Sequence, residues 1–249
     1  MTNGRAVLVT GASRGIGAAT ARAFAAQGDR VAVHYGRSEQ EARDVLASLE
    51  GDGHVLVQAD LADPDATKAM VDEAADALGG IDVLVNNAGI FVAHDIEETS
   101  YDEWQRLWSQ TLAVNLVAAA NASWCAVRHM PDGGRIVNVS SRGAFRGEPG
   151  QPAYGASKAG MVAMAQSLAK ALGHRRISVT VVAPGFVETD MAAEALAGPQ
   201  GDERRAESTM GRVARPEEVA AAVRFLASPD AEFSTGTVID VNGASFLRM

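Results

Sequence analysis

Short runs of β-branched and other apolar residues alternate along the chain with longer alanine-rich segments of helical periodicity. The apolar runs do not alternate apolar with polar residues, which favours strands buried on both faces of a parallel sheet. They lie at residues 6–10, 31–35, 55–57, 83–85, 135–139, 177–182 and 238–241. The helical segments lie at residues 15–27, 38–49, 64–78, 101–127, 154–172 and 216–226. This alternation predicts a doubly wound α/β fold, with a seven-stranded, mostly parallel sheet and helices on both faces.

One segment breaks the alternation. Residues 188–212 are rich in Ala, Gly, Glu and Arg and separate the sixth predicted strand from the last helix. An irregular insertion beside the carboxyl ends of parallel strands is typical of a substrate lid. Since no linker-like tract, low-complexity stretch or fixed-period repeat interrupts the chain, we predict a single domain over residues 1–249.

Charge and composition exclude several classes of function. The net charge is −9, which disfavours nucleic acid and anionic membrane surfaces as partners. No apolar run reaches the roughly 20 residues of a membrane span. Residues 1–5 run directly into the first strand, so we expect no signal peptide and a cytoplasmic protein. The lone Cys125 is expected to be buried and inert, and the five histidines lack metal-ligand spacing, so no metal is predicted.

A glycine-rich turn joins the first strand to the first helix. It reads Thr10-Gly11-Ala12-Ser13-Arg14-Gly15-Ile16-Gly17. Glycines allow the backbone to approach a pyrophosphate, and the helix N-terminus offers unpaired N–H groups with a favourable dipole. The spacing differs from the common G-x-G-x-x-G pattern. By itself it also suits a strand–helix turn that binds nothing.

The end of the second strand indicates which nicotinamide dinucleotide would bind. In dinucleotide folds an acidic residue at this place binds the ribose hydroxyls of NAD, whereas an arginine accommodates the extra phosphate of NADP. Here Arg37 stands twenty positions after Gly17, and no acid occurs in the strand end before Glu39. Arg14 could reach the same phosphate from the opening turn. The pattern favours NADP(H) over NAD(H), with a solvated surface Arg37 as the alternative.

The hydroxyls of Ser141 and Tyr154 and the amine of Lys158 are candidate catalytic groups. Tyr154 and Lys158 are four residues apart in a helical segment and therefore share one face. A lysine ammonium, together with an oxidised nicotinamide, would lower the tyrosine pKa toward that of a general acid–base. Ser141 ends the fifth strand and could hydrogen-bond a substrate oxygen, while Ser140 suits packing within the strand. A bare Tyr-x-x-x-Lys pattern also occurs by chance.

The chain resembles the short-chain dehydrogenase/reductase family over nearly its whole length. The motifs that carry the resemblance occur in family order: the Thr10 to Gly17 turn, Asp60, Asn86-Asn87-Ala88-Gly89, Asn115, Ser141, Tyr154-x-x-x-Lys158, and Pro184-Gly185 with Thr189. The resemblance implies catalytic roles for Ser141, Tyr154, Lys158 and Asn115, the last holding a water in a proton relay. It implies that the cofactor contacts Gly11, Ser13, Arg14, Gly15, Ile16, Gly17, Arg37, Ser38, Asp60, Leu61, Asn87, Ala88, Gly89, Tyr154, Lys158, Pro184, Gly185, Val187 and Thr189.

The resemblance implies an NADP(H)-dependent oxidoreductase that moves hydride between the nicotinamide and a ketone or secondary alcohol. Residues 184–191 and 239–243 are similar to the 3-oxoacyl-carrier-protein reductase branch. The turn at 130–134 lacks the basic residues that an acidic carrier would require, so a reductase of small free ketones is equally supported.

The family is commonly homotetrameric, and the resemblance therefore predicts a homotetramer. Trp104 and Trp108 lie four residues apart and suit either the core of the chain or a subunit interface. Two alternatives to the reductase stay open. One is an NAD-linked alcohol dehydrogenase. The other is a redox sensor that binds a dinucleotide without catalysis, which the presence of all four catalytic residues disfavours.

Overall fold

A seven-stranded parallel sheet in the order β3-β2-β1-β4-β5-β6-β7 forms the centre of the protein. The computed structural model describes residues 4–197 and 201–248. The strands are β1 (Ala6–Val9), β2 (Arg30–Tyr35), β3 (Val55–Gln58), β4 (Val83–Asn86), β5 (Arg135–Val139), β6 (Ser178–Pro184) and β7 (Val238–Val241). All seven predicted strands are present, and each pairing between neighbours is parallel. The strand order reverses between β1 and β4, where such folds open a ligand crevice.

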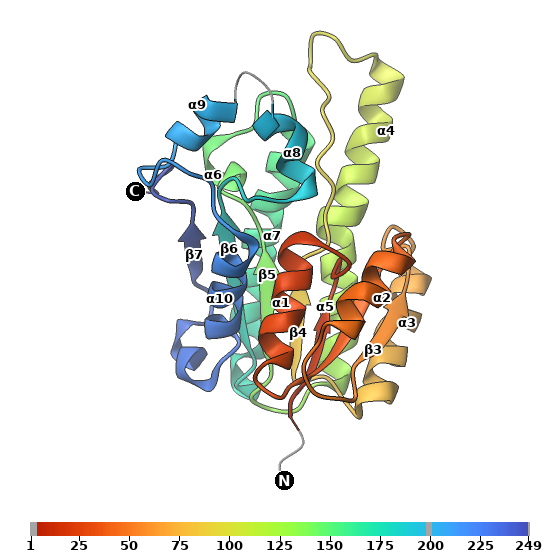
Figure 1. Cartoon of the computed structure of the whole chain (residues 1–249). Helices are drawn as coiled ribbons and strands as arrows, with labels where there is room; N and C mark the ends of the chain where they lie inside the picture. The colour runs from red at the N-terminus through yellow and green to blue at the C-terminus, as the bar shows by residue number, and fades with distance from the viewer. Residues whose placement is uncertain (1–3, 198–200, 249) are drawn as a thin grey trace.

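Two layers of helices cover the sheet (Figure 1). Helices α3 (Pro64–Leu78), α5 (Ala118–His129) and α7 (Pro152–Leu172) pack on one face. Helices α1 (Gly15–Ala25), α2 (Glu39–Ala47) and α10 (Pro216–Leu226) pack on the other. Successive residues of a strand serve opposite layers, as period-two geometry requires, so that Leu8 joins the first core and Val7 and Val9 the second. The predicted doubly wound α/β fold is therefore confirmed.

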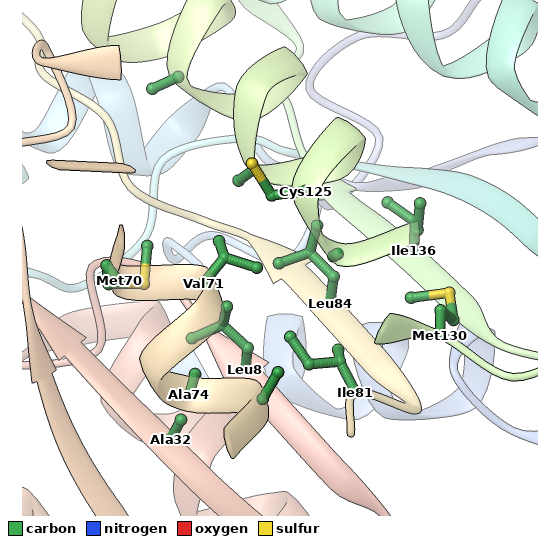
Figure 2. Packing of buried hydrophobic residues seen from close by; sticks show 14 of the residues in the cluster. Leu8, Ala32, Met70, Val71, Ala74, Ile81, Leu84, Cys125, Met130 and Ile136 are labelled. Carbon is green, nitrogen blue, oxygen red and sulfur yellow. The ribbon is translucent and has the colours of Figure 1, made fainter. Parts of the chain in front are cut away.

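Figure 2 shows part of the first core. Leu8 and Leu84 from adjacent strands meet Val71 of α3, and all three side chains are fully buried. Cys125 of α5 points into the same cluster and is buried, as predicted. Burial raises the pKa of its thiol, since an apolar environment disfavours the thiolate.

One predicted helix is interrupted. The segment expected as a single helix over 101–127 consists of α4 (Tyr101–Leu112), a π-helical stretch (Ala113–Val117) and α5. An extra residue in the turn is not visible in apolar periodicity, and such π-bulges occur frequently at functional sites. The predicted helix 154–172 also begins two residues earlier, at Pro152, because proline is favoured at the first helical position.

The predicted lid segment is more regular than expected. It contains α8 (Asp190–Ala197) and α9 (Gly201–Ala206), which lie beyond the carboxyl end of the sheet with the short α6 (Gly143–Arg146) (Figure 1). Its alanine-rich composition favours helix. Residues 198–200 of the segment, and residues 1–3 and 249 of the predicted domain, lie outside the described part of the chain.

Candidate active site

A cavity of about 770 Å³ opens at the carboxyl ends of the strands. Residues that directly follow β1, β2, β3, β4, β5 and β6 line it, which places it at the crevice between β1 and β4. With the exception of Gly17 and Asn115, all predicted catalytic and cofactor-binding residues line this cavity. The fold thus collects side chains that are up to 178 positions apart, from Gly11 to Thr189, around one space.

The glycine turn has the shape that a phosphate requires. Gly11 and Gly15 have φ values of +63° and +55°, a left-handed conformation that other residues rarely adopt. Gly17 does not line the cavity. A Cβ there would lie 2.2 Å from the Gly11 carbonyl oxygen and 2.6 Å from Nδ2 of Asn87. Gly17 therefore allows α1 to pack closely under the turn, and its direct contact with the cofactor stays a prediction.

His34 holds the glycine turn from behind, a role that the sequence did not indicate. The backbone N–H of Gly11 donates to Nδ1 of His34 at 2.9 Å, and Nε2 of the ring lies 3.2 Å from the Ala59 carbonyl oxygen. Nδ1 must accept, so the neutral ring carries its proton on Nε2. Burial lowers the pKa of His34 to about 4. This buried imidazole links the ends of β1, β2 and β3 beneath the cavity.

This arrangement predicts a loss of stability in acid. The pKa of His34 is about 4 in the folded protein, against an ordinary value of 6.5. Between these values the unfolded chain binds more protons, so the free energy of unfolding falls as pH falls, by about 3 kcal/mol across the window. In His34→Asn, whose Oδ1 can still accept from Gly11, urea unfolding at pH 7 and pH 4.5 should show a smaller loss. His174→Asn, at an exposed histidine, should behave as wild type. An unchanged pH dependence in His34→Asn would contradict this assignment.

Two arginines line the cavity. Arg37 is exposed directly after β2, and Arg14 is exposed in the glycine turn. The nearby Glu39 pairs with Arg43 at 2.6 Å rather than neutralising Arg37. Arg14 lies 3.9 Å from Asp190 at the start of α8, a loose contact between two exposed groups that contributes little. The first turn of α1 contains no acidic residue, so this end of the site is suited to an anion.

Ser141, Tyr154 and Lys158 lie together near the end of β5. Ser141 forms a side-chain hydrogen bond with Tyr154, and its Oγ accepts from the backbone N–H of Gly143 at 3.0 Å. Nζ of Lys158 donates to the Val139 carbonyl at 2.8 Å and lies 5.8 Å from the centre of the Tyr154 ring. Ser140 instead donates to the Lys158 carbonyl from a buried position, as a packing residue would.

Without a nicotinamide, the pKa of Tyr154 lies above its ordinary value. Burial is the main cause that raises it to about 12, the hydrogen bond with Ser141 lowers it, and the Glu148 carboxylate adds a smaller increase. Burial also lowers the pKa of Lys158 to about 8. The protein groups alone therefore do not lower the tyrosine pKa, because the cost of removing a phenolate from water dominates, and the expected lowering with an oxidised nicotinamide stays a prediction. At neutral pH the tyrosine keeps its proton.

Asn115 lies behind the cavity in the π-helical stretch. Its Oδ1 accepts from the backbone N–H of Ile90 at 2.8 Å, and its Nδ2 donates to the Ile90 carbonyl at 3.0 Å and to Ser157 Oγ at 3.2 Å. Ser157 donates in turn to the Tyr154 carbonyl at 2.7 Å. The buried amide is thus fully engaged and joins the segment after β4 to the helix that carries Tyr154 and Lys158.

The remaining side of the cavity is largely apolar and was not predicted. The Phe91 ring meets the Tyr154 ring edge-on at 4.8 Å. Phe186 lies between the guanidinium groups of Arg142, at 5.0 Å, and Arg204, at 5.3 Å. Buried Arg142 forms an ion pair with Glu207 beyond α9. Other apolar lining residues are Ile90, Val114, Met191 and Ala192.

Over residues 4–197 and 201–248, no cluster of three or more His, Cys, Asp or Glu side chains is placed to hold a metal ion. Within the same ranges, no helix is long and apolar enough to span a bilayer.

The chain is similar to known proteins over nearly its whole length. The family model described as enoyl-(acyl carrier protein) reductase matches residues 11–244. The 3-oxoacyl-[acyl-carrier-protein] reductase FabG of Vibrio cholerae is 37% identical, with 98% of each chain covered. The 3beta-hydroxysteroid dehydrogenase 1 of Eggerthella lenta is 39% identical, covering 98% of this chain and 94% of that protein. A short chain dehydrogenase of Burkholderia cenocepacia, solved in complex with NADP, has 40% identity and a TM-score of 0.90, with 98% of each chain covered.

Proposed function

Because the chain belongs to the short-chain dehydrogenase/reductase family, we propose that it is an NADP(H)-dependent ketoreductase. It interconverts a ketone and a secondary alcohol. The observation that carries the proposal is the cavity in which Ser141, Tyr154 and Lys158 meet the glycine turn. The two similar proteins from Vibrio cholerae and Eggerthella lenta are named for reactions at a keto or hydroxyl carbon. The NAD-linked and non-catalytic alternatives are not favoured.

The cofactor is NADP(H), which supplies the hydride when it is bound. The left-handed glycines and the start of α1 would hold its pyrophosphate, because their backbone leaves room and N–H groups for an anion. Arg37 and Arg14 would hold the additional phosphate. Asp60 and Leu61 would border the adenine, and residues 184–189 the nicotinamide.

The remaining chemistry is proton transfer to the substrate oxygen. With a pKa of about 12, Tyr154 is protonated at neutral pH and can donate to an oxygen that gains negative charge during reduction. Ser141 shares a hydrogen bond with it, so the two hydroxyls can receive the same oxygen. Lys158 places a positive charge beside them and would hold the nicotinamide ribose. Asn115 would keep the relay through Lys158 connected to solvent.

The lining of the cavity indicates an apolar substrate. Phe91 packs against Tyr154, where a ketone would approach, and Phe186 and Met191 also line the cavity. NADPH oxidation should therefore be assayed with apolar free ketones and with 3-oxoacyl thioesters. Turnover of at least one class supports the reductase. Tight NADPH binding without turnover of either class would support the sensor alternative.

Assembly, location and the lid are further parts of this proposal. We place the protein in the cytoplasm as a homotetramer and assign residues 188–212 as the lid of a single domain. Two separate surfaces expose apolar side chains. One carries Val117 and Trp124 around α5, and the other carries Phe225 of α10 and Phe233 of the following turn. Two distinct self-complementary faces are what a tetramer with crossed twofold axes requires.

Charges on either face should split the assembly. Trp124 is 55% exposed and Phe233 fully exposed, so replacing either with Glu should leave the subunit folded while opposing its burial in an interface. Light scattering after size exclusion should give dimers for Trp124→Glu and for Phe233→Glu, and monomers for the double variant. A tetrameric mass in all three variants would contradict these interfaces.

A further inference from the structure

The helix that carries Tyr154 has no cap of its own. Gln151, at the position before α7, makes no side-chain capping bond, and Pro152 has no N–H to offer. The first N–H that needs a partner is that of Ala153, directly before Tyr154, and it donates to Nε2 of His94 at 3.2 Å. His94 lies 59 positions earlier in the chain, in the segment between β4 and α4. A residue from a distant loop therefore supplies the missing cap.

His94 is held in one orientation and one tautomer. The residue is 2% exposed, its backbone N–H donates to the Gly150 carbonyl at 2.9 Å, and its ring packs on Trp104 at 5.5 Å. Nδ1 lies 2.8 Å from the Val92 carbonyl oxygen and can only donate to it. Nε2 is then the acceptor that the Ala153 N–H requires. The imidazole thus joins the segment 91–94 to the start of α7.

The same segment also contacts the catalytic ring. Phe91, three residues before His94, packs edge-on against the Tyr154 ring at 4.8 Å. The tyrosine is therefore held at its backbone through His94 and Ala153, and at its ring through Phe91. Because displacement of a reacting group by about 1 Å can cost on the order of 100-fold in rate, such fixing has consequences for catalysis.

We propose that His94 is a positioning residue for ketone reduction, acting through the start of α7 to set the Tyr154 hydroxyl against the substrate oxygen. The inference rests on the proposed function, since it names a residue that serves the same site. His94 does not line the cavity, so it would touch neither substrate nor cofactor. Its effect should therefore appear in kcat and leave NADPH binding unchanged.

Two variants separate the acceptor from the bulk of the ring. In His94→Gln, Oε1 can take the place of Nε2 and accept from Ala153. His94→Phe keeps a ring against Trp104 but removes the acceptor. The matched control is His129→Phe, because His129 also makes a ring hydrogen bond, with Asp72 at 2.7 Å, but lies at the end of α5 beside the amino end of β4.

The experiment measures kcat per folded site, the NADPH Kd, and amide exchange of the 151–156 segment. We expect His94→Phe to lose about 10- to 100-fold in kcat with an unchanged Kd and faster exchange. His94→Gln should recover most of the kcat and protection, and His129→Phe should behave as wild type. A merely structural role would lower only the folded fraction. Wild-type kcat in His94→Phe, or no recovery in His94→Gln, would overturn the inference. If the wild type binds NADPH but reduces no ketone, the proposed function is overturned instead. In that case amide exchange still tests the inference, because unchanged exchange in His94→Phe would show that His94 does not cap α7.

Discussion

Tyr154→Phe should lower the kcat of ketone reduction by about 10³-fold, within the range for loss of a general acid, while the NADPH Kd changes less than about twofold. The substitution removes one hydroxyl. The phenyl ring can keep its edge contact with Phe91, and the hydrogen bond from the Ala153 N–H to His94 is unaffected. Without the hydroxyl, only Ser141 or water remains to protonate the substrate oxygen. Steady-state kinetics with a substrate found in the ketone assay, and nicotinamide fluorescence for binding, measure both quantities.

The control for this prediction is Tyr101→Phe, because Tyr101 is a 75% exposed tyrosine at the start of α4. It should keep wild-type kcat. The kcat of Ser141→Ala should lie between those of Tyr154→Phe and Tyr101→Phe, since Tyr154 keeps its own proton and loses only a hydrogen-bonding partner. If Tyr154→Phe retains more than about a tenth of the wild-type kcat, the hydroxyl is not the proton donor, and the assignment built on it fails.

The parts of the fold that follow from local pattern were predictable. The strands are continuous apolar runs buried on both faces, such as Ala6–Val9, in which all residues are buried. The order of the strands in the sheet was not predicted, whereas the family resemblance implied that Gly11, Ser141 and Tyr154 serve one site, and all three line one cavity. The π-helical stretch at 113–117 was missed because one additional residue in a turn leaves the apolar periodicity almost unchanged.

The supporting residues of the site could not be predicted, because their roles depend on contacts between distant segments. In the sequence, His34 and His94 are two of five histidines without metal-ligand spacing, and nothing else sets them apart. Only the fold brings His34 to the backbone N–H of Gly11 and His94 to the backbone N–H of Ala153. The ion pair of Arg142 with Glu207 likewise joins positions 65 apart. A single histidine or arginine has no sequence signature of its partner, whereas a phosphate-binding turn is contiguous.

The choice between NADPH and NADH should depend on Arg37. Arg37→Asp should weaken NADPH binding by about 100-fold, since it removes a charge-assisted contact of about 1.5–3 kcal/mol and places a carboxylate opposite a phosphate. The NADH Kd should stay unchanged or fall, because an acid at this position can bind the ribose hydroxyls. Arg14 alone would not restore the preference, because one guanidinium cannot offset the repulsion between the new carboxylate and a dianionic phosphate. Titrations followed by nicotinamide fluorescence measure the Kd of NADPH and of NADH, each for the wild type and for Arg37→Asp.

Arg22→Asp is the matched control, since Arg22 is an exposed arginine of α1 that does not line the cavity. It changes the net charge by the same amount as Arg37→Asp and should leave the NADPH Kd within about twofold, since a distant exposed charge is largely screened. A similar loss in both variants would indicate a general effect of charge rather than a phosphate contact. Equal wild-type affinity for NADPH and NADH would overturn the assignment of both Arg37 and Arg14. Binding of either dinucleotide would then depend on the rest of the cavity, where Asp60 is the exposed acid after β3 that could reach a ribose or adenine.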